Sequence, residues 1–199
     1  PMFNHDRSIA IMLNGEVYNF QELKQDLISS GISFKSSSDT EVVLKGYELK
    51  GIEFIHSLVG MFAISILDIP KQQLYLIRDR AGVKPLFYSN YDGNIIWGSE
   101  LKALRNHPAF KHATDVNALG LYFQNGNIPA PYTIYQDCYK LEPGHYIQFD
   151  LSNFSSKNIK YWDVNDYYNQ PNNSISYEDA KQRTEELMID AFKYRMIAD

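Results

Sequence analysis

The 199-residue sequence has a single cysteine, Cys138, so it cannot form an intrachain disulfide. This excludes a small secreted scaffold held together by disulfides and favours a reducing, cytoplasmic location. The sequence also lacks an apolar run of about 18 residues, which excludes a transmembrane helix. The stretch from Pro1 to Arg7 has no apolar segment of the signal-peptide type. These absences predict a cytoplasmic protein without a membrane partner.

An excess of positive charge is also absent. Lys and Arg total 19 against 24 Asp and Glu, so the sequence offers no broad basic surface for nucleic acid. The five histidines are scattered and lack a two-His helical spacing, which argues against a metal site. The glycine-rich phosphate loops G-x-x-x-x-G-K-S/T and G-x-G-x-x-G are missing. We therefore expect no metal and no bound cofactor in this chain.

Hydrophobic residues make up 44% of the chain, enough to bury a core. Apolar and β-branched runs predict strands over 7–13, 61–67, 73–78, 86–91, 94–98, 145–149 and 159–162. Helical spacing predicts helices over 20–30, 39–50, 100–106, 115–123 and 176–199. The Asp92-Gly93 link predicts a type I′ hairpin. This order favours an α+β fold, with two antiparallel sheets covered by helices, over a parallel doubly wound sheet.

Polar residues before several of these helices predict their N-caps. Asn19 with Glu22, and Ser38 with Glu41, have the spacing of a capping box. Further caps are expected at Ser99, Thr114 and Ser176.

The polar, Asn-rich segment 163–174 has the composition of a linker. The helix that follows has an apolar stripe that must pack on another surface, and we expect self-association through it. The stripe includes Ala180, Leu187, Met188, Ala191 and Ile197.

Three positions have an ordinary interpretation, and two of them also allow a functional one. Asn14-Gly15 is typical of a turn, because both residues tolerate positive φ, but an Asn amide beside a Gly N–H can also stabilise an oxyanion. Asp39 can stabilise a helix start through the helix dipole, or bind a substrate ammonium. Glu16, as a single acid in a loop, is usually solvated.

Two further segments also have an ordinary interpretation. The charged segment 78–86 fits a solvated surface bend, or a loop that docks on another domain. Cys138 has no nearby histidine in the sequence and fits a small buried apolar residue better than a nucleophile.

Five motifs in order resemble the glutamine amidotransferase domain of glutamine-hydrolysing asparagine synthetases. They are NGEVYN at 14–19, SDTEV at 38–42, GMFA at 60–63, RDRAGVKPLFY at 78–88 and GSELKAL at 98–104. The resemblance implies an N-terminal-nucleophile hydrolase fold, an αββα sandwich with two antiparallel sheets between helix layers. It continues through the stretch from Pro131 to His145 and through Tyr161-Trp162, and thus covers essentially the whole chain.

The resemblance also implies a mechanism. A cysteine at the mature N-terminus attacks the side-chain amide of glutamine, with its own α-amine as base. By this resemblance Asn14 and Gly15 hold the oxyanion, while Glu16 and Asp39 bind the amino-acid end of glutamine. The chain does not contain that N-terminal cysteine, and Cys138 has no free α-amine with which to replace it. We therefore expect these 199 residues to be a piece of a longer enzyme and to be inactive by themselves.

The same resemblance implies three segments. Residues 1–162 form the amidotransferase domain, 163–175 a linker, and 176–199 the first helix of a synthetase domain that uses ATP and Mg²⁺. That domain amidates aspartate with ammonia released from glutamine, and a homodimer is a further expectation. Two alternatives stay open: a different acceptor, such as a sugar acid in surface polysaccharide biosynthesis, or a domain that has lost its nucleophile and acts as a binding or regulatory module.

Overall fold

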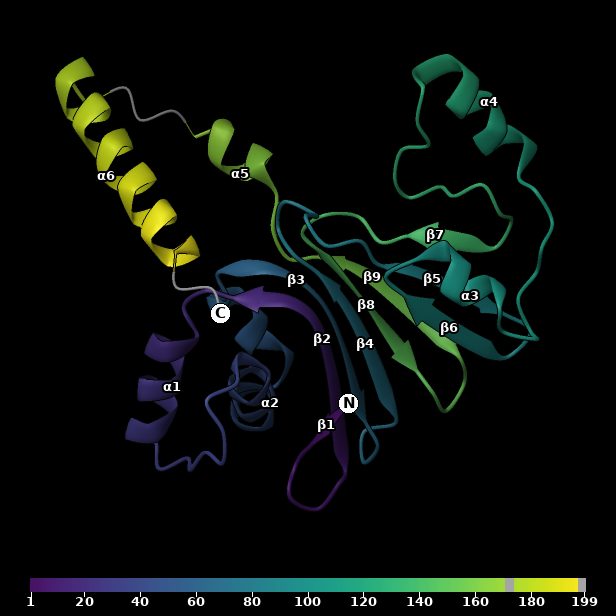
Figure 1. Cartoon of the computed structure of the whole chain (residues 1–199), viewed down its shortest axis with the longest axis horizontal. Coiled ribbons are helices and arrows are strands. Elements are labelled where there is room, and N and C mark those ends of the chain that lie inside the picture. The colour runs from purple at the N-terminus through teal and green to yellow at the C-terminus, as the bar shows by residue number, and fades with distance from the viewer. Residues whose placement is uncertain (171–173, 197–199) are drawn as a thin grey trace. The chain divides into compact units, whose positions relative to one another are not determined.

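The computed structural model describes residues 1–170 and 174–196 of the chain (Figure 1). It consists of two compact units. Unit 1 comprises Pro1–Gly15 and Met61–Tyr161. Unit 2 comprises Glu16–Gly60 and the described residues from Trp162 onward.

A six-stranded sheet has the order β1-β2-β3-β4-β8-β9, and nearly all of its residues belong to unit 1. The pairs β1–β2, β3–β4, β4–β8 and β8–β9 are antiparallel. The strands are β1 (Met2–Phe3), β2 (Ile9–Val17), β3 (Gly60–Asp68), β4 (Gln73–Arg78), β8 (His145–Asp150) and β9 (Ser155–Lys160). The expected strands 61–67, 73–78 and 145–149 are therefore confirmed, and the last strand lies a few residues earlier than expected.

A smaller antiparallel sheet, also in unit 1, has the order β6-β5-β7. Its strands are β5 (Phe87–Tyr91), β6 (Asn94–Gly98) and β7 (Cys138–Lys140). Asp92 and Gly93 connect β5 to β6 with φ of 51° and 72°. Positive φ at both central residues is the requirement of a type I′ turn, so this hairpin prediction is confirmed.

The two sheets pack face to face through an apolar core. Tyr88, Ile95 and Trp97 of the smaller sheet pack against a buried cluster composed mainly of residues of the larger one. The buried members of the cluster are Ala63, Leu74, Leu76, Leu86, Leu141, Ile147 and Phe149. Burying a side chain such as Phe or Leu stabilises a fold by about 1.5–3 kcal/mol, so this cluster explains why the sheets associate.

The other face of the smaller sheet is covered by helix α3 (Leu101–Arg105), as Figure 1 shows. Leu104 is buried there with Cys138 and Phe110, and Phe87 and Ile96 pack against them. Because side chains alternate along a strand, Phe87 and Tyr88 point to opposite faces. Helix α4 (Val116–Asn125) also belongs to unit 1.

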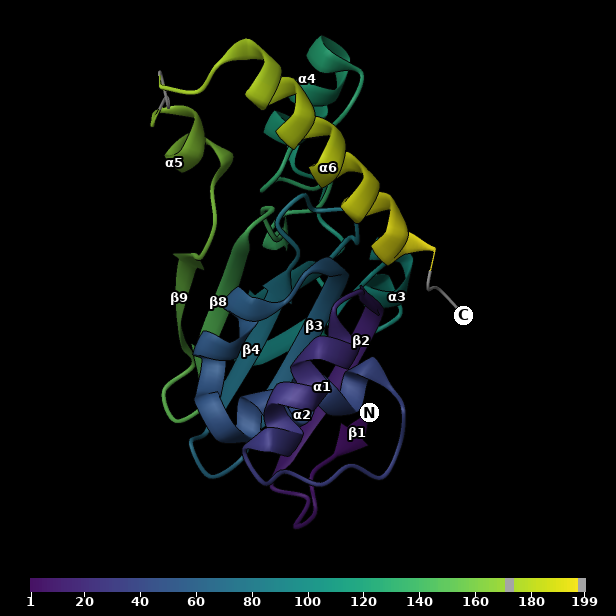
Figure 2. The same ribbon diagram turned by 90° about the vertical axis from the view of Figure 1, so that its left-hand side faces the viewer.

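Unit 2 contains the remaining helices. Helices α1 (Phe20–Ser29) and α2 (Asp39–Lys50) lie side by side, as both views show, and the short 3-10 helix η1 (Gly51–Ser57) follows α2 (Figure 2). Helices α5 (Val164–Tyr168) and α6 (Tyr177–Arg195) come last in the chain. No helix in the described ranges is both long and apolar enough to cross a bilayer.

Several predicted caps are wrong. The Asn19 side chain does not cap α1; its amide donates to the Ser57 carbonyl, and its oxygen accepts from the Val59 N–H. Helix α4 is capped by Asp115 instead of Thr114. Asn19 has strong partners in another segment, and such partners override a local capping preference.

The caps at Ser38 and Ser176 are confirmed: their hydroxyls accept from the Thr40 and Asp179 N–H groups. The expected linker contains helix α5, capped by Asp163. Residues 171–173 of the linker, and 197–199 of the last expected helix with its Ile197, lie outside the described residues. On α6, Leu187 and Met188 of the predicted stripe are 53% and 55% exposed.

Glu41 does not complete the predicted capping box. Its carboxylate accepts hydrogen bonds from the Lys35 N–H at 2.8 Å, from the Ser36 N–H at 2.7 Å and from the Ser36 hydroxyl at 2.6 Å. Burial by itself raises the pKa of Glu41, but these hydrogen bonds and nearby Lys45 outweigh it, so the pKa of the carboxyl lies below its usual value. Glu41 therefore fastens the segment before α2 to the helix.

This arrangement predicts a pH-dependent effect of Glu41→Gln. Because folding lowers the Glu41 pKa, its stabilising contribution is complete above the unfolded-state pKa and is lost as pH falls through the folded-state pKa. We expect Glu41→Gln to melt below the wild type at pH 7 and the gap to shrink below about pH 4. Thermal melts monitored by circular dichroism test this, with Asp26→Asn at an exposed position of α1 as control. An unchanged gap at low pH would contradict it.

Candidate functional site

The Asn14-Gly15 pair lies inside strand β2 and does not form a turn, so the turn interpretation and the expected strand end at residue 13 are wrong. Gly15 has a φ of 134°. A Cβ on this residue would lie 2.0 Å from the Met61 carbonyl oxygen, far inside van der Waals contact. Only glycine therefore allows the backbone of β3 to come this close.

Asn14 is exposed on β2, and its side chain has a defined partner. Its amide Nδ2 donates to the Ser99 hydroxyl oxygen at 2.7 Å. Ser99 lies directly after β6 and does not cap α3: the N-cap is Glu100, and it makes no side-chain capping bond. Sequence reasoning assigned Ser99 only a capping role, although it lies in the GSELKAL motif.

Asp39 is the first residue of α2 and is half-buried. Its Oδ2 accepts a hydrogen bond from the Val17 N–H at 3.0 Å, which fixes the carboxylate beside the residue that follows Glu16. Because Ser38 supplies the cap, Asp39 does not have to cap the helix. The structure thus brings Asp39 and the Glu16-Val17 segment of unit 2 together.

The residues after Val17 are held firmly. The Tyr18 N–H donates to the Val59 carbonyl at 2.7 Å, and the Asn19 side chain makes the two hydrogen bonds described above. From the end of α6, the Arg195 guanidinium lies 5.2 Å from the centre of the Tyr18 ring, and the Tyr194 hydroxyl donates to Glu22. The segment carrying Glu16 is therefore anchored at its C-terminal side.

Asp79 organises the charged loop that follows β4. It is 0% exposed, and its carboxylate accepts from the backbone N–H groups of Phe62, Ala81, Val83 and Lys84 at 2.9–3.3 Å. Four N–H donors converge on one carboxylate, so this residue sets the path of the loop. Neither earlier interpretation of the segment, a solvated bend or a docking loop, describes the buried Asp79.

Arg78 supports the same loop from the other side. Its guanidinium donates to the carbonyl oxygens of Lys84, Leu141 and Gly82 at 2.9, 2.6 and 2.7 Å. Burial lowers the pKa of Arg78, and the negative charge of Asp79 offsets only part of this decrease. The Tyr161 hydroxyl donates to the Arg78 carbonyl, and burial raises the pKa of that phenol. This network is structural.

Cys138 is 2% exposed on β7 and packs with Leu104 and Phe110. Burial raises the pKa of its thiol, which disfavours the thiolate that a nucleophile needs. Its predicted role as a small buried apolar residue is confirmed. Within residues 1–170 and 174–196, no group of three or more His, Cys, Asp or Glu side chains could hold a metal ion.

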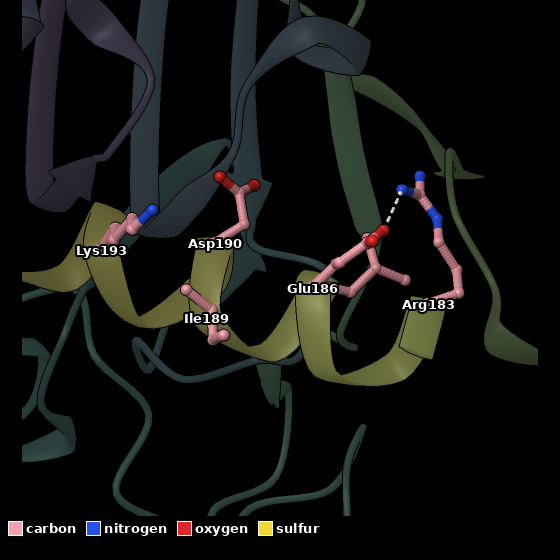
Figure 3. A pocket seen from close by; sticks show the side chains of 6 residues that line it. Arg183, Glu186, Ile189, Asp190 and Lys193 are labelled. Atoms are coloured by element: carbon pink, nitrogen blue, oxygen red, sulfur yellow. Dashed lines mark hydrogen bonds and ion pairs between the residues drawn. The ribbon is translucent and has the colours of Figure 1, made fainter. Parts of the chain in front are cut away.

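A cavity lies along helix α6, and its lining contains none of the candidate site residues described above. Figure 3 shows the Arg183–Glu186 ion pair, 3.3 Å long, with Ile189, Asp190 and Lys193 farther along the helix. All of its described lining residues come from α6, and none of the predicted site residues is among them. It is therefore not a candidate for the glutamine site.

Comparisons with known proteins agree with the motifs. Residues 1–162 match the family described as glutamine amidotransferase domain. Asparagine synthetase [glutamine-hydrolyzing] 2 of Bacillus subtilis is 37% identical over 171 residues, covering 83% of this chain and 23% of that protein. A putative asparagine synthetase [glutamine-hydrolyzing] 2 of Methanocaldococcus jannaschii is 37% identical over 194 residues, covering 96% of this chain and 36% of that protein. The chain thus spans between about a quarter and a third of these relatives.

Solved structures show the fold. The glutamine phosphoribosylpyrophosphate amidotransferase of B. subtilis matches with a TM-score of 0.57 at 20% identity, over 81% of this chain and 31% of that one. With the two antiparallel sheets, this confirms the expected α+β, N-terminal-nucleophile hydrolase fold. The sequence match over residues 1–162 shows that the chain belongs to the glutamine amidotransferase domain family.

Proposed function

We propose that this chain supplies the glutamine-hydrolysing site of a glutamine-dependent asparagine synthetase. The observation that carries the proposal is the geometry of β2, where the Asn14 amide is held by Ser99 and Gly15 lies against the β3 backbone. A side-chain amide and an adjacent backbone N–H are the donor types that stabilise a developing oxyanion. The names of the relatives over the same residues support the choice of reaction.

In the proposed mechanism, a nucleophile attacks the side-chain carbonyl carbon of glutamine. The carbonyl oxygen becomes an oxyanion, to which Asn14 Nδ2 and the Gly15 N–H donate hydrogen bonds. When the oxyanion collapses, the C–N bond breaks and the amine leaves as ammonia, carrying the proton that the nucleophile gave up. Water then cleaves the covalent intermediate and releases glutamate. We propose that the nucleophile is an N-terminal cysteine of the intact enzyme, since the buried Cys138 has neither a free α-amine nor an accessible thiol.

We propose that Asp39 and Glu16 bind the amino-acid end of glutamine. The Asp39 carboxylate is held in place by the Val17 N–H, and its negative charge would attract the α-ammonium of the substrate. Glu16 precedes Val17 on the same strand and contributes a second negative charge. Together these residues select a substrate that carries an ammonium group.

The rest of the reaction is assigned to residues outside this chain. We propose that ATP and Mg²⁺ activate aspartate there for attack by ammonia, because this sequence has no phosphate-loop motif. In the same proposal, 1–162 form the amidotransferase domain, 163–175 a linker and 176–199 the first helix of the synthetase domain. The intact enzyme is proposed to be a cytoplasmic homodimer.

The acceptor is tested on the intact enzyme with glutamine, ATP and Mg²⁺, offering either aspartate or a sugar acid. We expect glutamine-dependent formation of asparagine, quantified by amino-acid chromatography, and no product from the sugar acid. Amidation of the sugar acid alone would support the alternative acceptor. Absence of both products and of glutamate release would support a binding or regulatory module.

Asp39→Asn tests the substrate site. The variant keeps an oxygen that can accept from the Val17 N–H and removes the charge, so we expect the fold to be preserved. Losing a hydrogen bond to a charged group costs about 1.5–3 kcal/mol, which predicts a KM for glutamine about 10- to 100-fold higher. Synthesis from free ammonia should be unchanged in the same preparation. An equal loss of both activities would indicate a structural role for Asp39.

A further inference from the structure

Ser99 is the partner of Asn14 across 85 positions of sequence, and neither its motif nor its position predicts this contact. We propose that Ser99 is a positioning residue for glutamine hydrolysis, which holds the Asn14 amide in the orientation that presents an N–H to the oxyanion. This inference rests on the proposed function and assigns a role to a residue that has none so far.

The chemistry of the amide gives the first argument. An Asn side chain has two N–H donors and one oxygen, and rotation by 180° about its last bond exchanges them. The Ser99 hydroxyl oxygen accepts one Nδ2 hydrogen at 2.7 Å. This contact holds the amide in place and leaves its second N–H for a substrate oxygen. Because a serine hydroxyl can donate as well as accept, Ser99 fixes the position of the amide, and the Nδ2-to-hydroxyl contact gives its orientation.

The anchoring of Ser99 gives the second argument. Its neighbour Gly98 is the last residue of β6 and pairs with Phe87 of β5. On the other side, α3 is fixed by Leu104, which is 1% exposed. The Gly98 Cα also lies close to this leucine, because a Cβ there would be 3.1 Å from Leu104 Cδ1. Ser99 thus lies between a strand and a packed helix, the rigid support that a pre-organised donor requires.

The local charge and hydrogen bonding give the third argument. In the part of the chain that the structure describes, the side chain of Ser99 makes one hydrogen bond, the one from Asn14. The Glu100 carboxylate, next to Ser99 in the sequence, pairs with Lys102 at 2.7 Å. A serine before a helix often caps it, but Ser99 does not cap α3. The hydroxyl is therefore available to orient Asn14.

The test is a double-mutant cycle in the intact enzyme, with kcat and KM for glutamine measured for each variant. One neutral hydrogen bond predicts that Ser99→Ala lowers kcat about two- to tenfold with little change in KM. Ser99→Thr retains a hydroxyl and should recover most of the activity. In an Asn14→Ala background, Ser99→Ala should have no further effect, because the amide that Ser99 positions is no longer present. Ser152→Ala, a surface serine in the β8–β9 hairpin, is the control.

Each outcome separates the inference from the function on which it rests. If Asn14→Ala itself has no effect on glutamine hydrolysis, the proposed oxyanion role fails. If Asn14→Ala is strongly impaired but Ser99→Ala is not, the role of Ser99 alone is overturned. Equal, additive losses from Ser99→Ala in both backgrounds would also overturn it, since they indicate a structural effect. Thermal melts of all variants show whether each is folded.

Discussion

Asn14→Ala in the intact enzyme is expected to lower kcat for glutamine hydrolysis by about 10²- to 10³-fold. This is the usual cost of removing one donor to an oxyanion, about 2.7–4 kcal/mol of transition-state stabilisation. Asn14 is exposed on β2 and makes one side-chain hydrogen bond among the described residues, with Ser99, so little stability should be lost. The Gly15 N–H remains as the second donor, which explains why activity should be reduced and not abolished.

Steady-state release of glutamate measures this effect, and synthesis from free ammonia in the same preparation is the control. Because ammonia bypasses glutamine hydrolysis, that synthesis should be unchanged. Asn14→Asp provides a second variant of nearly the same shape. It replaces the donor with a carboxylate and should be at least as impaired, since a negative charge would then face the oxyanion. A loss below tenfold in a folded Asn14→Ala enzyme would remove Asn14 from this role.

Asp79→Ala is expected to destabilise the fold more than any other substitution considered. The carboxylate is 0% exposed and accepts from four backbone N–H groups. Removing it leaves these N–H groups without their acceptor and removes the negative charge that acts on the buried Arg78 guanidinium. Breaking a buried charged network in this way costs about 3–5 kcal/mol. At roughly 2–4 °C per kcal/mol for a domain of this size, Tm should fall by about 6–20 °C.

Thermal melts of the 199-residue chain test this prediction. Asp79→Asn should lie between the wild type and Asp79→Ala, because it retains one accepting oxygen but turns an NH₂ group toward N–H donors. Asp26→Ala, at an exposed position of α1, is the matched control and should change stability by no more than about 0.5 kcal/mol. A decrease in Tm for Asp79→Ala as small as that for Asp26→Ala would contradict the structural role of Asp79.

Local signals in the sequence were sufficient for much of the fold. Asp92-Gly93 specifies its hairpin because both residues tolerate the positive φ that a type I′ turn requires. Ser38 and Ser176 begin α2 and α6 because their hydroxyls reach N–H groups two or three residues ahead. These interactions are complete within a few residues, so the sequence alone determines them. Asn14, Gly15 and Asp39 were also identified as candidates from the ordered motifs.

The tertiary structure alone decided how these candidates are arranged. Asn14-Gly15 has the local preferences of a turn, yet the adjacent backbone of β3 keeps it in a strand and requires glycine at position 15. Asp79 belongs to a segment whose charges suggest solvent exposure, but four N–H donors from β3 and its own loop make burial favourable. The contact between Asn14 and Ser99 joins residues far apart in sequence, and only folding brings such partners within hydrogen-bonding distance.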